Sequence, residues 1–271
     1  MAPADFQDRE KATMRAAWLT DIHLDFLSRQ GCDAFFTTIA SHNPDAVFLT
    51  GDISVAPSLL PHLQAMSEAL HKPIYFVLGN HDFYHGSIRE VRASVREGCH
   101  ANPLLKYLPD AGVIPLTAST GLVGHDGWGD SRYGNYATSP VKLNDHVLIK
   151  ELTGLTPSKL QQHLMRLGDE AASYLHETLP LAFNRYRRVV LLTHVPPFRE
   201  SCWYQGQVSN NEWLPFFACQ AVGEVLRETM QARPSSHLTV YCGHTHNSGT
   251  AHVLPNLTVF TGAAGECSDR S

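Results

Sequence analysis

Five apolar segments of this sequence each end in side chains that bind metal ions or transfer protons. Residues 74–78 are followed by Gly79 and then by Asn80, His81 and Asp82. The other four segments lead to the same side-chain types, namely Asp21 with His23, Asp52, His194, and His244 with His246. One polar ending carries little information, because strands commonly end in polar turns. Five endings with the same chemistry indicate one shared site.

The apolar segments are predicted to be β-strands that deliver these side chains to one place. They cover residues 16–20, 46–50, 74–78, 189–193 and 237–242. Short apolar runs that close in Gly or a polar residue are typical of buried strands that enter tight turns. In open α/β sheets, active sites lie just past the carboxyl ends of such strands. The polar endings are therefore expected to converge.

Seven of the strand-end side chains can bind a metal ion through oxygen or nitrogen. They are Asp21, His23, Asp52, Asn80, His194, His244 and His246. A site for one ion needs about four to six donors, so seven donors fit two ions that share a carboxylate. The mixture of imidazole, carboxylate and carboxamide suits Mn, Fe or Zn better than Mg or Ca. The alternative interpretation of each side chain alone is a capped turn.

Helical spacing of apolar residues separates most of the predicted strands. Helices are predicted over residues 26–41, 57–71, 88–99, 139–150, 157–183 and 215–230. Further short strands are predicted at 113–116 and 120–123, as an antiparallel pair, and at 251–254 and 257–261. The early alternation of strands and helices predicts parallel strands with helical crossovers. We expect one domain over residues 1–271, with a poorly packed lead-in at 1–15 and tail at 262–271.

Composition narrows the class of protein and of partner. The net charge of -5 and the pI of about 6.3 do not indicate a broad basic surface for nucleic acid, although they leave such a substrate open. No apolar run approaches the ~20 residues that span a bilayer. The N-terminus has no apolar segment of a secretory signal, and the six cysteines form no C-x-x-C pair. We therefore expect a cytoplasmic protein with reduced thiols, while its oligomeric state is not indicated.

The order of these motifs resembles that of the calcineurin-like metallophosphoesterase family. The matching blocks are Asp21-x-His23, Gly51-Asp52, Gly79-Asn80-His81-Asp82, His194 and Gly243-His244-x-His246. All five blocks are present, no ligand is replaced, and together they extend over nearly the whole chain. The resemblance implies an α/β protein with a four-layer α/β/β/α sandwich, two mixed β-sheets and a dinuclear metal centre at the strand ends.

The resemblance also implies which residues bind each ion. Asp21, His23, Asp52 and His246 would hold one ion, and Asp52, Asn80, His194 and His244 would hold the other. Asp52 would bridge the two ions, which are expected to be Mn²⁺, with Fe or Zn as alternatives. A hydroxide between the ions would attack phosphorus. Metal coordination supports hydroxide as the nucleophile, because a water molecule bound to a divalent ion has its pKa lowered towards ~7.

His81 and Asp82 are predicted to be catalytic. In the family pattern, the residue at the position of His81 donates a proton to the leaving oxygen. Adjacent side chains diverge, so His81 cannot easily share the ion of Asn80. Asp82 is expected to raise the pKa of His81 and fix its tautomer. The alternatives are that His81 binds a phosphate oxygen and that Asp82 caps a helix.

Several residues outside the motifs are weaker candidates for substrate binding. Arg132 and Tyr133 lie in a polar, Gly-rich loop at residues 124–136 and could bind a phosphodiester or a base. The long connection at residues 195–214 contains aromatic residues that could form a lid or a stacking platform, namely Trp203, Tyr204 and Trp213. Three further histidines could reach the site: His85, His125 and His252. For all of them, surface or core packing is the alternative.

These features lead to three functional hypotheses. The first is a metal-dependent phosphoric ester hydrolase that acts on a phosphomonoester or phosphodiester, with a small phosphorylated substrate such as a nucleotide. The second is a nuclease with the same chemistry, which the lack of an Arg/Lys-rich segment disfavours. The third is a metal-binding scaffold without turnover. Such relatives lose ligands, and this chain has lost none.

Overall fold

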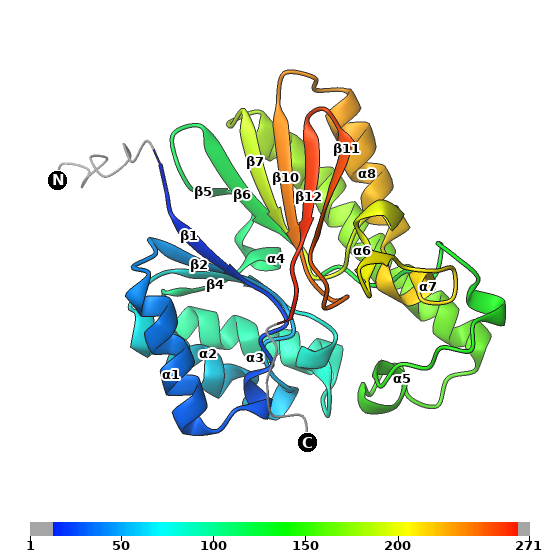
Figure 1. The fold of residues 1–271 in the computed structure, drawn as a ribbon, viewed down its shortest axis with the longest axis horizontal. Coiled ribbons are helices and arrows are strands. Elements are labelled where there is room, and N and C mark those ends of the chain that lie inside the picture. Colours follow the sequence, from blue (N-terminus) through cyan, green and yellow to red (C-terminus); the bar gives the residue numbers. More distant parts are fainter. Residues whose placement is uncertain (1–12, 265–271) are drawn as a thin grey trace.

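Residues 13–264 are described by a computed structural model, and their strands form two main sheets (Figure 1). The smaller sheet has the strand order β1-β2-β3-β4, and all of its pairings are parallel. Its strands are β1 Ala16–Leu19, β2 Ala46–Thr50, β3 Ile74–Val77 and β4 Leu105–Tyr107. Parallel strands bring their carboxyl ends to the same edge, so the turns after β1, β2 and β3 lie side by side.

The larger sheet has the order β11-β12-β10-β7-β6-β5 and is mixed, because the pairs at its two edges are antiparallel. Its strands are β5 Ile114–Pro115, β6 Thr120–Gly124, β7 Arg188–Leu192, β10 His237–Cys242, β11 Gly249–Leu254 and β12 Leu257–Thr261. The predicted antiparallel pair at its edge is confirmed. The predicted fold class also holds, with the difference that the smaller sheet is wholly parallel rather than mixed.

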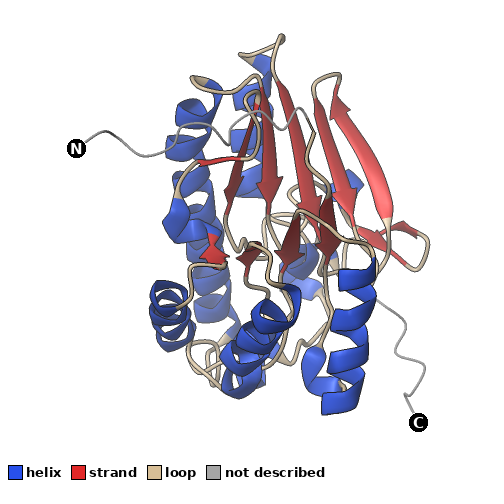
Figure 2. Cartoon of the chain, turned by 90° about the vertical axis from the view of Figure 1, so that its left-hand side faces the viewer, coloured by secondary structure: helices blue, strands red, loops and turns tan. Residues whose placement is uncertain are grey.

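Helices cover the outer faces of both sheets (Figure 2). The α-helices are α1 Arg29–Ser41, α2 Ala56–Leu70, α3 Ile88–Ala101, α4 Leu108–Ala111, α5 Asp145–Leu148, α6 Pro157–Phe183, α7 Leu214–Phe217 and α8 Gln220–Gln231. The first three pack on the smaller sheet, whereas α6 and α8 pack on the larger one. Single turns of 3-10 helix are η1 Leu24–Phe26, η2 His81–Phe83, η3 Tyr136–Thr138 and η4 Arg199–Ser201.

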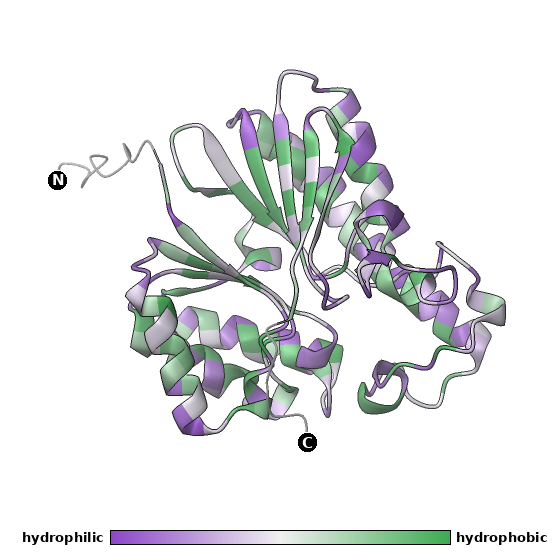
Figure 3. Ribbon diagram, in the orientation of Figure 1, coloured by the Kyte–Doolittle hydropathy of each residue, from purple (hydrophilic) through white to green (hydrophobic). Residues whose placement is uncertain are grey.

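Alternation along the strands explains the four layers. In β2, Val47 and Leu49 face the helices, while Ala46 and Phe48 face the other sheet, where they join a cluster that includes Leu192. Every residue of β2 is buried, because both of its faces are covered. Each fully buried Val, Leu or Phe stabilises the fold by roughly 1.5–3 kcal/mol. Figure 3 shows the corresponding concentration of hydrophobic residues in the strands.

Two predicted helices differ from the structure, and three short strands were not predicted. The helix predicted over 139–150 is only the single turn α5, because Pro140 lies in a segment without helical hydrogen bonds. The helix predicted over 215–230 is divided into α7 and α8 by Ala218, whose backbone is extended (φ -139°, ψ 148°). The strand β4 and the hairpin of β8 Trp203–Tyr204 and β9 Gln207–Val208 were not predicted, because runs of two or three residues show no period.

The predictions for the lead-in and the tail fall mostly on residues 1–12 and 265–271, outside the described part. Gly262 is described, and there the prediction of poor packing is wrong, because it is buried and its N–H donates to Cys242 O at 2.8 Å. None of the helices within residues 13–264 combines the length and the apolar character needed to cross a bilayer.

Candidate metal centre

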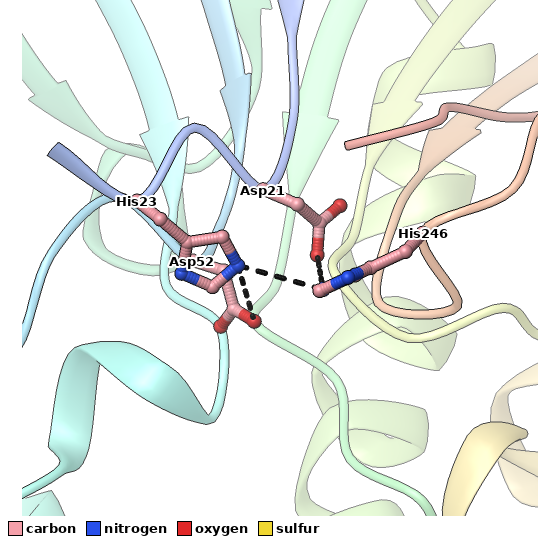
Figure 4. Close-up of side chains that lie close together, drawn as sticks. All are labelled: Asp21, His23, Asp52 and His246. Carbon is pink, nitrogen blue, oxygen red and sulfur yellow. Dashed lines mark hydrogen bonds and ion pairs between the residues drawn. The ribbon is translucent and has the colours of Figure 1, made fainter. Parts of the chain in front are cut away.

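Four of the predicted ligands meet at the carboxyl ends of strands from both sheets (Figure 4). Asp21 and His23 follow β1, Asp52 follows β2, and His246 follows β10, and their ligand atoms lie within 4.8 Å of one another. His23 Nε2 is 3.4 Å from His246 Nε2 and 4.0 Å from Asp52 Oδ2. His246 Nε2 is also 3.4 Å from Asp21 Oδ1. Two carboxylates and two imidazoles thus point at one another.

The other three predicted ligands form a second group, in which His194 lies beside the second oxygen of Asp52 and contacts both Asn80 and His244. His194 Nε2 is 3.3 Å from Asp52 Oδ1, 3.1 Å from Asn80 Oδ1 and 3.2 Å from His244 Nδ1. Asp52 therefore has Oδ2 towards His23 and Oδ1 towards His194. This is the position of a carboxylate that two ions can share.

Backbone conformation aims these side chains. Five of the seven have left-handed backbones, with φ of 50° at Asp21, 41° at His23, 52° at Asp52, 72° at His244 and 60° at His246. Such conformations are uncommon outside Gly, and they concentrate at functional sites, where neighbouring hydrogen bonds hold them. Here the N–H of Asp21 donates to Gly51 O at 3.1 Å, and the N–H of His23 donates to Asp52 O at 3.0 Å. The turns after β1 and β2 are therefore held together.

Two of the histidines have their tautomers set by main-chain carbonyls. His194 Nδ1 lies 2.8 Å from Thr50 O, and His244 Nε2 lies 3.0 Å from Phe216 O. A carbonyl only accepts hydrogen bonds, so each of these nitrogens carries the proton. The lone pairs of His194 Nε2 and His244 Nδ1 consequently face each other across the site. Histidines that bind metals are commonly oriented in this way.

The electrostatics of the site fit bound cations. Burial raises the pKa of Asp21 to about 7, and burial also raises the pKa of Asp52. Burial, together with the neighbouring His81 and His246, lowers the pKa of His23 to about 3. The His23 imidazole is thus neutral, and divalent cations would supply the positive charge that the buried carboxylates of Asp21 and Asp52 require. The donor set fits two such ions.

His81 is paired with Asp25, which the sequence analysis missed. His81 Nε2 lies 3.0 Å from Asp25 Oδ2. Burial alone would lower the pKa of His81. The hydrogen bond to Asp25 and the nearby carboxylates outweigh burial, so the pKa of His81 is raised. Besides the group of four described above, His23, Asp25 and His81 also have possible ligand atoms within 4.8 Å of one another. The spacing Asp21-x-His23-x-Asp25 was the available signal, since it places three polar groups at alternate positions.

Asp82 contributes to the raised pKa of His81, as predicted, but within residues 13–264 its carboxylate makes no hydrogen bond to the imidazole and so does not fix the tautomer of His81. Its two oxygens accept hydrogen bonds of 2.7–3.0 Å from four backbone N–H groups, those of Asp52, Ile53, Ser54 and Gly79. The carboxylate is fully buried and is not among the residues that line the cavity containing the ligands. Asp82 therefore ties the turn after β2 to the turn after β3, and positions Asp52 and Asn80 through their backbones.

Arg132 and Tyr133, predicted to bind substrate, lie outside the cavity that contains the ligands. The guanidinium of Arg132 donates to Asp130 at 2.9 Å and to Asp169 at 2.7 Å, so acidic residues of its own surroundings hold it. Tyr133 packs against the hydrophobic core. The prediction that this polar loop binds substrate is not supported, because the Arg132 side chain pairs with acidic groups of the protein itself.

The three further histidine candidates also lie away from the ligands. His125 is buried, with its ring against Tyr174. His252 lies on β11 and contacts Thr258. His85 belongs to a different cavity, between α2 and α3.

Five of the seven predicted ligands, all but Asp21 and His194, line a cavity of about 400 Å³, within the size range of small-molecule sites. Tyr204 and Trp213 line it, as two of the three predicted aromatic residues, but Trp203 does not. Sequence reasoning missed other lining residues: Phe26, Tyr84, Lys142, Leu143, Asn144, Asp145, Phe217 and Thr245. Except for Thr245, which lies between His244 and His246, they stand outside the motif blocks.

Asp145 supports a predicted ligand from this newly found segment. Its Oδ1 accepts hydrogen bonds from Asn80 Nδ2 at 2.9 Å and from the hydroxyl of Tyr84 at 2.7 Å. The amide nitrogen of Asn80 is therefore fixed on Asp145, which leaves its carbonyl oxygen directed at His194.

The model of the family described as calcineurin-like phosphoesterase matches residues 14–248. Among curated proteins, none is significantly similar in sequence to this chain.

Solved structures with low sequence identity share the fold. A dimetal phosphatase from Danio rerio is 14% identical, covers 93% of this chain and 87% of its own, and gives a TM-score of 0.58. Phosphopantetheinyl hydrolase from Mycobacterium tuberculosis is 13% identical, with coverages of 92% and 89% and a TM-score of 0.61. A Thermus thermophilus protein is 14% identical, with coverages of 93% and 90% and a TM-score of 0.56.

Proposed function

The chain belongs to the calcineurin-like phosphoesterase family, and on this premise we propose that it hydrolyses a phosphomonoester or phosphodiester with two divalent metal ions. In this proposal one ion is held by Asp21, His23, Asp52 and His246. The other is held by Asp52, Asn80, His194 and His244. The observation that carries the assignment is the position of Asp52, whose two oxygens face different ligand groups. Mn²⁺ is the proposed metal, with Fe and Zn as alternatives, because imidazole and carboxylate donors are mixed.

The reaction needs a nucleophile, a stabilised phosphate and a proton for the leaving oxygen. Two bound divalent cations would lower the pKa of a water molecule to ~7 and offset the charge of the phosphate. His81 would donate the proton, and the raised pKa of its imidazole favours the protonated form that this role requires. Asp25 would hold the His81 ring in place through the hydrogen bond at Nε2.

A small ester is favoured over a nucleic-acid strand. Lys142 is the only Lys or Arg among the residues that line the cavity in the described part of the chain. Binding along a nucleic-acid backbone normally requires a positively charged groove. The proposal includes the cytoplasmic location predicted from the sequence, as well as one domain for the whole chain.

The test is hydrolysis of 4-nitrophenyl phosphate and bis(4-nitrophenyl) phosphate by purified protein with added Mn²⁺. Turnover is expected with at least one of them, and His81→Ala is expected to reduce it by about 10²–10⁴-fold, the usual contribution of a general acid. Asp52→Asn is expected to reduce turnover at least as much. Full activity of Asp52→Asn would refute the proposed metal arrangement, and a lack of turnover on all esters would refute the function.

A further inference from the structure

Three aromatic side chains form one wall of the cavity. This aromatic wall consists of Tyr204 from β8, Trp213 directly before α7 and Phe217 from α7, with ring centroids 4.9–5.5 Å apart. Phe217 also lies edge-on to the proposed ligand His244, at a centroid distance of 5.2 Å. The wall therefore begins at the metal ligands and continues away from them.

The rings of the wall are not simply core residues. Phe217 is buried, but Tyr204 and Trp213 are only half-buried, and all three line the cavity. Tyr204 is carried by the short hairpin of β8 and β9, whose turn residues Gln205 and Gly206 both have positive φ, of 51° and 76°. Two positive φ values in a two-residue loop are typical of the tight turn that matches strand twist. The hairpin thus holds the Tyr204 ring at the cavity.

Another ring lies beside the proposed proton donor. Phe26 is 63% exposed, and its centroid is 5.6 Å from those of His23 and His81. A Phe with this exposure gains little stability from burial, so its place in the cavity lining points to contact with a ligand. Aromatic rings therefore flank the site near both His81 and His244.

The charges of the cavity suit one phosphate group on an uncharged organic group. Besides the proposed ligands and the proposed proton donor His81, the lining offers one cation, Lys142, and one additional buried carboxylate, Asp145. A substrate with several phosphates along a strand would find no row of cations here. The aromatic wall instead offers flat apolar area, on which planar rings stack.

We propose that the cavity takes a phosphate ester whose organic group carries a planar aromatic ring, with the ring stacked on Tyr204 and Trp213. The inference rests on the proposed function, because it places the phosphate at the two ions. A nucleoside phosphate is a member of this substrate class, whereas a sugar phosphate or glycerol phosphate is not.

The test compares esters that share the reacting group and differ only in the ring. Adenosine 5′-monophosphate and ribose 5-phosphate have the same primary leaving oxygen, and their methyl diesters serve if only diesters react. With Mn²⁺ present, kcat/KM is expected to be roughly 10–100-fold higher for the adenosine compound, the usual effect of stacking one base. Equal values for the two compounds would overturn the proposal.

Variants of the wall make the comparison specific. Trp213→Leu is expected to lower the preference for the adenosine compound about tenfold, with little change for the ribose compound. Trp213→Phe keeps a ring and is expected to retain most of the preference. Val208→Ala, in the hairpin that carries Tyr204 but outside the cavity lining, is the control. A misfolded variant would lose both activities together, so the ratio separates stacking from stability.

Binding separates this inference from the proposed function. If no ester is hydrolysed, calorimetric binding of the same two compounds with Mn²⁺ still decides whether the ring is recognised. The missing turnover would then refute the proposed hydrolysis, while tighter binding of adenosine 5′-monophosphate than of ribose 5-phosphate would support recognition of the ring by the aromatic wall. Equal binding of the two compounds would refute the aromatic wall as well. A DNA or RNA oligonucleotide cleaved faster than both small esters would also overturn the proposal, because it would make the strand the substrate.

Discussion

Asp52 is the residue on which the candidate site depends most. Its Oδ1 accepts a hydrogen bond from the N–H of His81 at 2.8 Å and lies near His194, while its Oδ2 faces His23. Its backbone N–H is in turn held by Asp82. A side chain fixed from both ends cannot turn away, so both ligand groups keep a common member.

Protonation of Asp21 predicts how metal binding depends on pH. Its pKa is raised to about 7 by burial, so below pH 7 the metal-free carboxyl holds a proton that a cation must displace. Affinity for Mn²⁺ is therefore expected to fall as the pH drops below about 7. Calorimetry at pH 6 in two buffers with different ionisation enthalpies would measure the released protons.

Asp21→Asn is the matched variant for that experiment. It is expected to bind Mn²⁺ more weakly and to release fewer protons, because the amide has none to lose. An affinity that stays constant down to about pH 4, where an ordinary Asp titrates, would contradict the assignment.

The pair of His81 and Asp25 makes a second prediction at this scale. Asp25 raises the pKa of His81, so its removal should lower that pKa and deprotonate the proton donor at lower pH. In Asp25→Asn, the alkaline decline of kcat is expected to move to lower pH than in the native protein. A pH profile of unchanged shape, with only lower activity, would show that Asp25 merely stabilises the fold.

At the scale of elements, the turns after the strands are packed too closely for ordinary side chains. A Cβ on Gly79 would collide with Asp52 Oδ1 and lie 2.7 Å from His194 Cε1. The turn after β3 can therefore approach the turns after β2 and β7 only with Gly at this position. This contact joins the carboxyl ends of strands from the two sheets.

Gly79→Ala is accordingly expected to reduce activity at least about 100-fold, because displacement of ligands by ~1 Å is costly in catalysis. Gly31→Ala is the control, since Gly31 lies in α1 and its Cβ would have ordinary contacts of 3.4 Å or more. It is expected to leave activity unchanged and to stabilise the protein by about 0.5–1 kcal/mol. Similar losses in both variants would contradict this account.

The same elements explain how much of the structure the sequence could predict. Apolar runs such as 46–50 mark buried strands reliably, and their polar ends marked Asp52 and its neighbours. Asp25 and Asp145 were missed, because their value comes from tertiary contacts with His81 and Asn80. Arg132 was misjudged for the same reason, since nothing in its loop predicts the ion pair with Asp169.

At the scale of the whole molecule, each proposed ion takes ligands from both sheets. Asp21, His23 and Asp52 follow strands of the smaller sheet, and His246 follows β10 of the larger one. Asn80 likewise follows β3, whereas His194 follows β7. Bound metal would therefore hold the two sheets together at their carboxyl ends.

Removal of metal is expected to lower thermal stability. Mn²⁺ at 100 times its dissociation constant stabilises the folded state by ~2.7 kcal/mol, which corresponds to about 5–10 °C in Tm for a protein of this size. A chelator should reverse this shift. The Asp52→Asn variant should show a much smaller one, and a full shift in that variant would place the stabilising ion elsewhere.

The most direct test of the dinuclear site is a crystal structure with Mn²⁺, using anomalous scattering to locate the ions. Two peaks are expected about 3.5–4 Å apart, one on each side of the Asp52 carboxylate. One peak would be expected near His23 and His246, the other near Asn80 and His194. A single peak, or an ion held by His23, Asp25 and His81 instead, would contradict the dinuclear site.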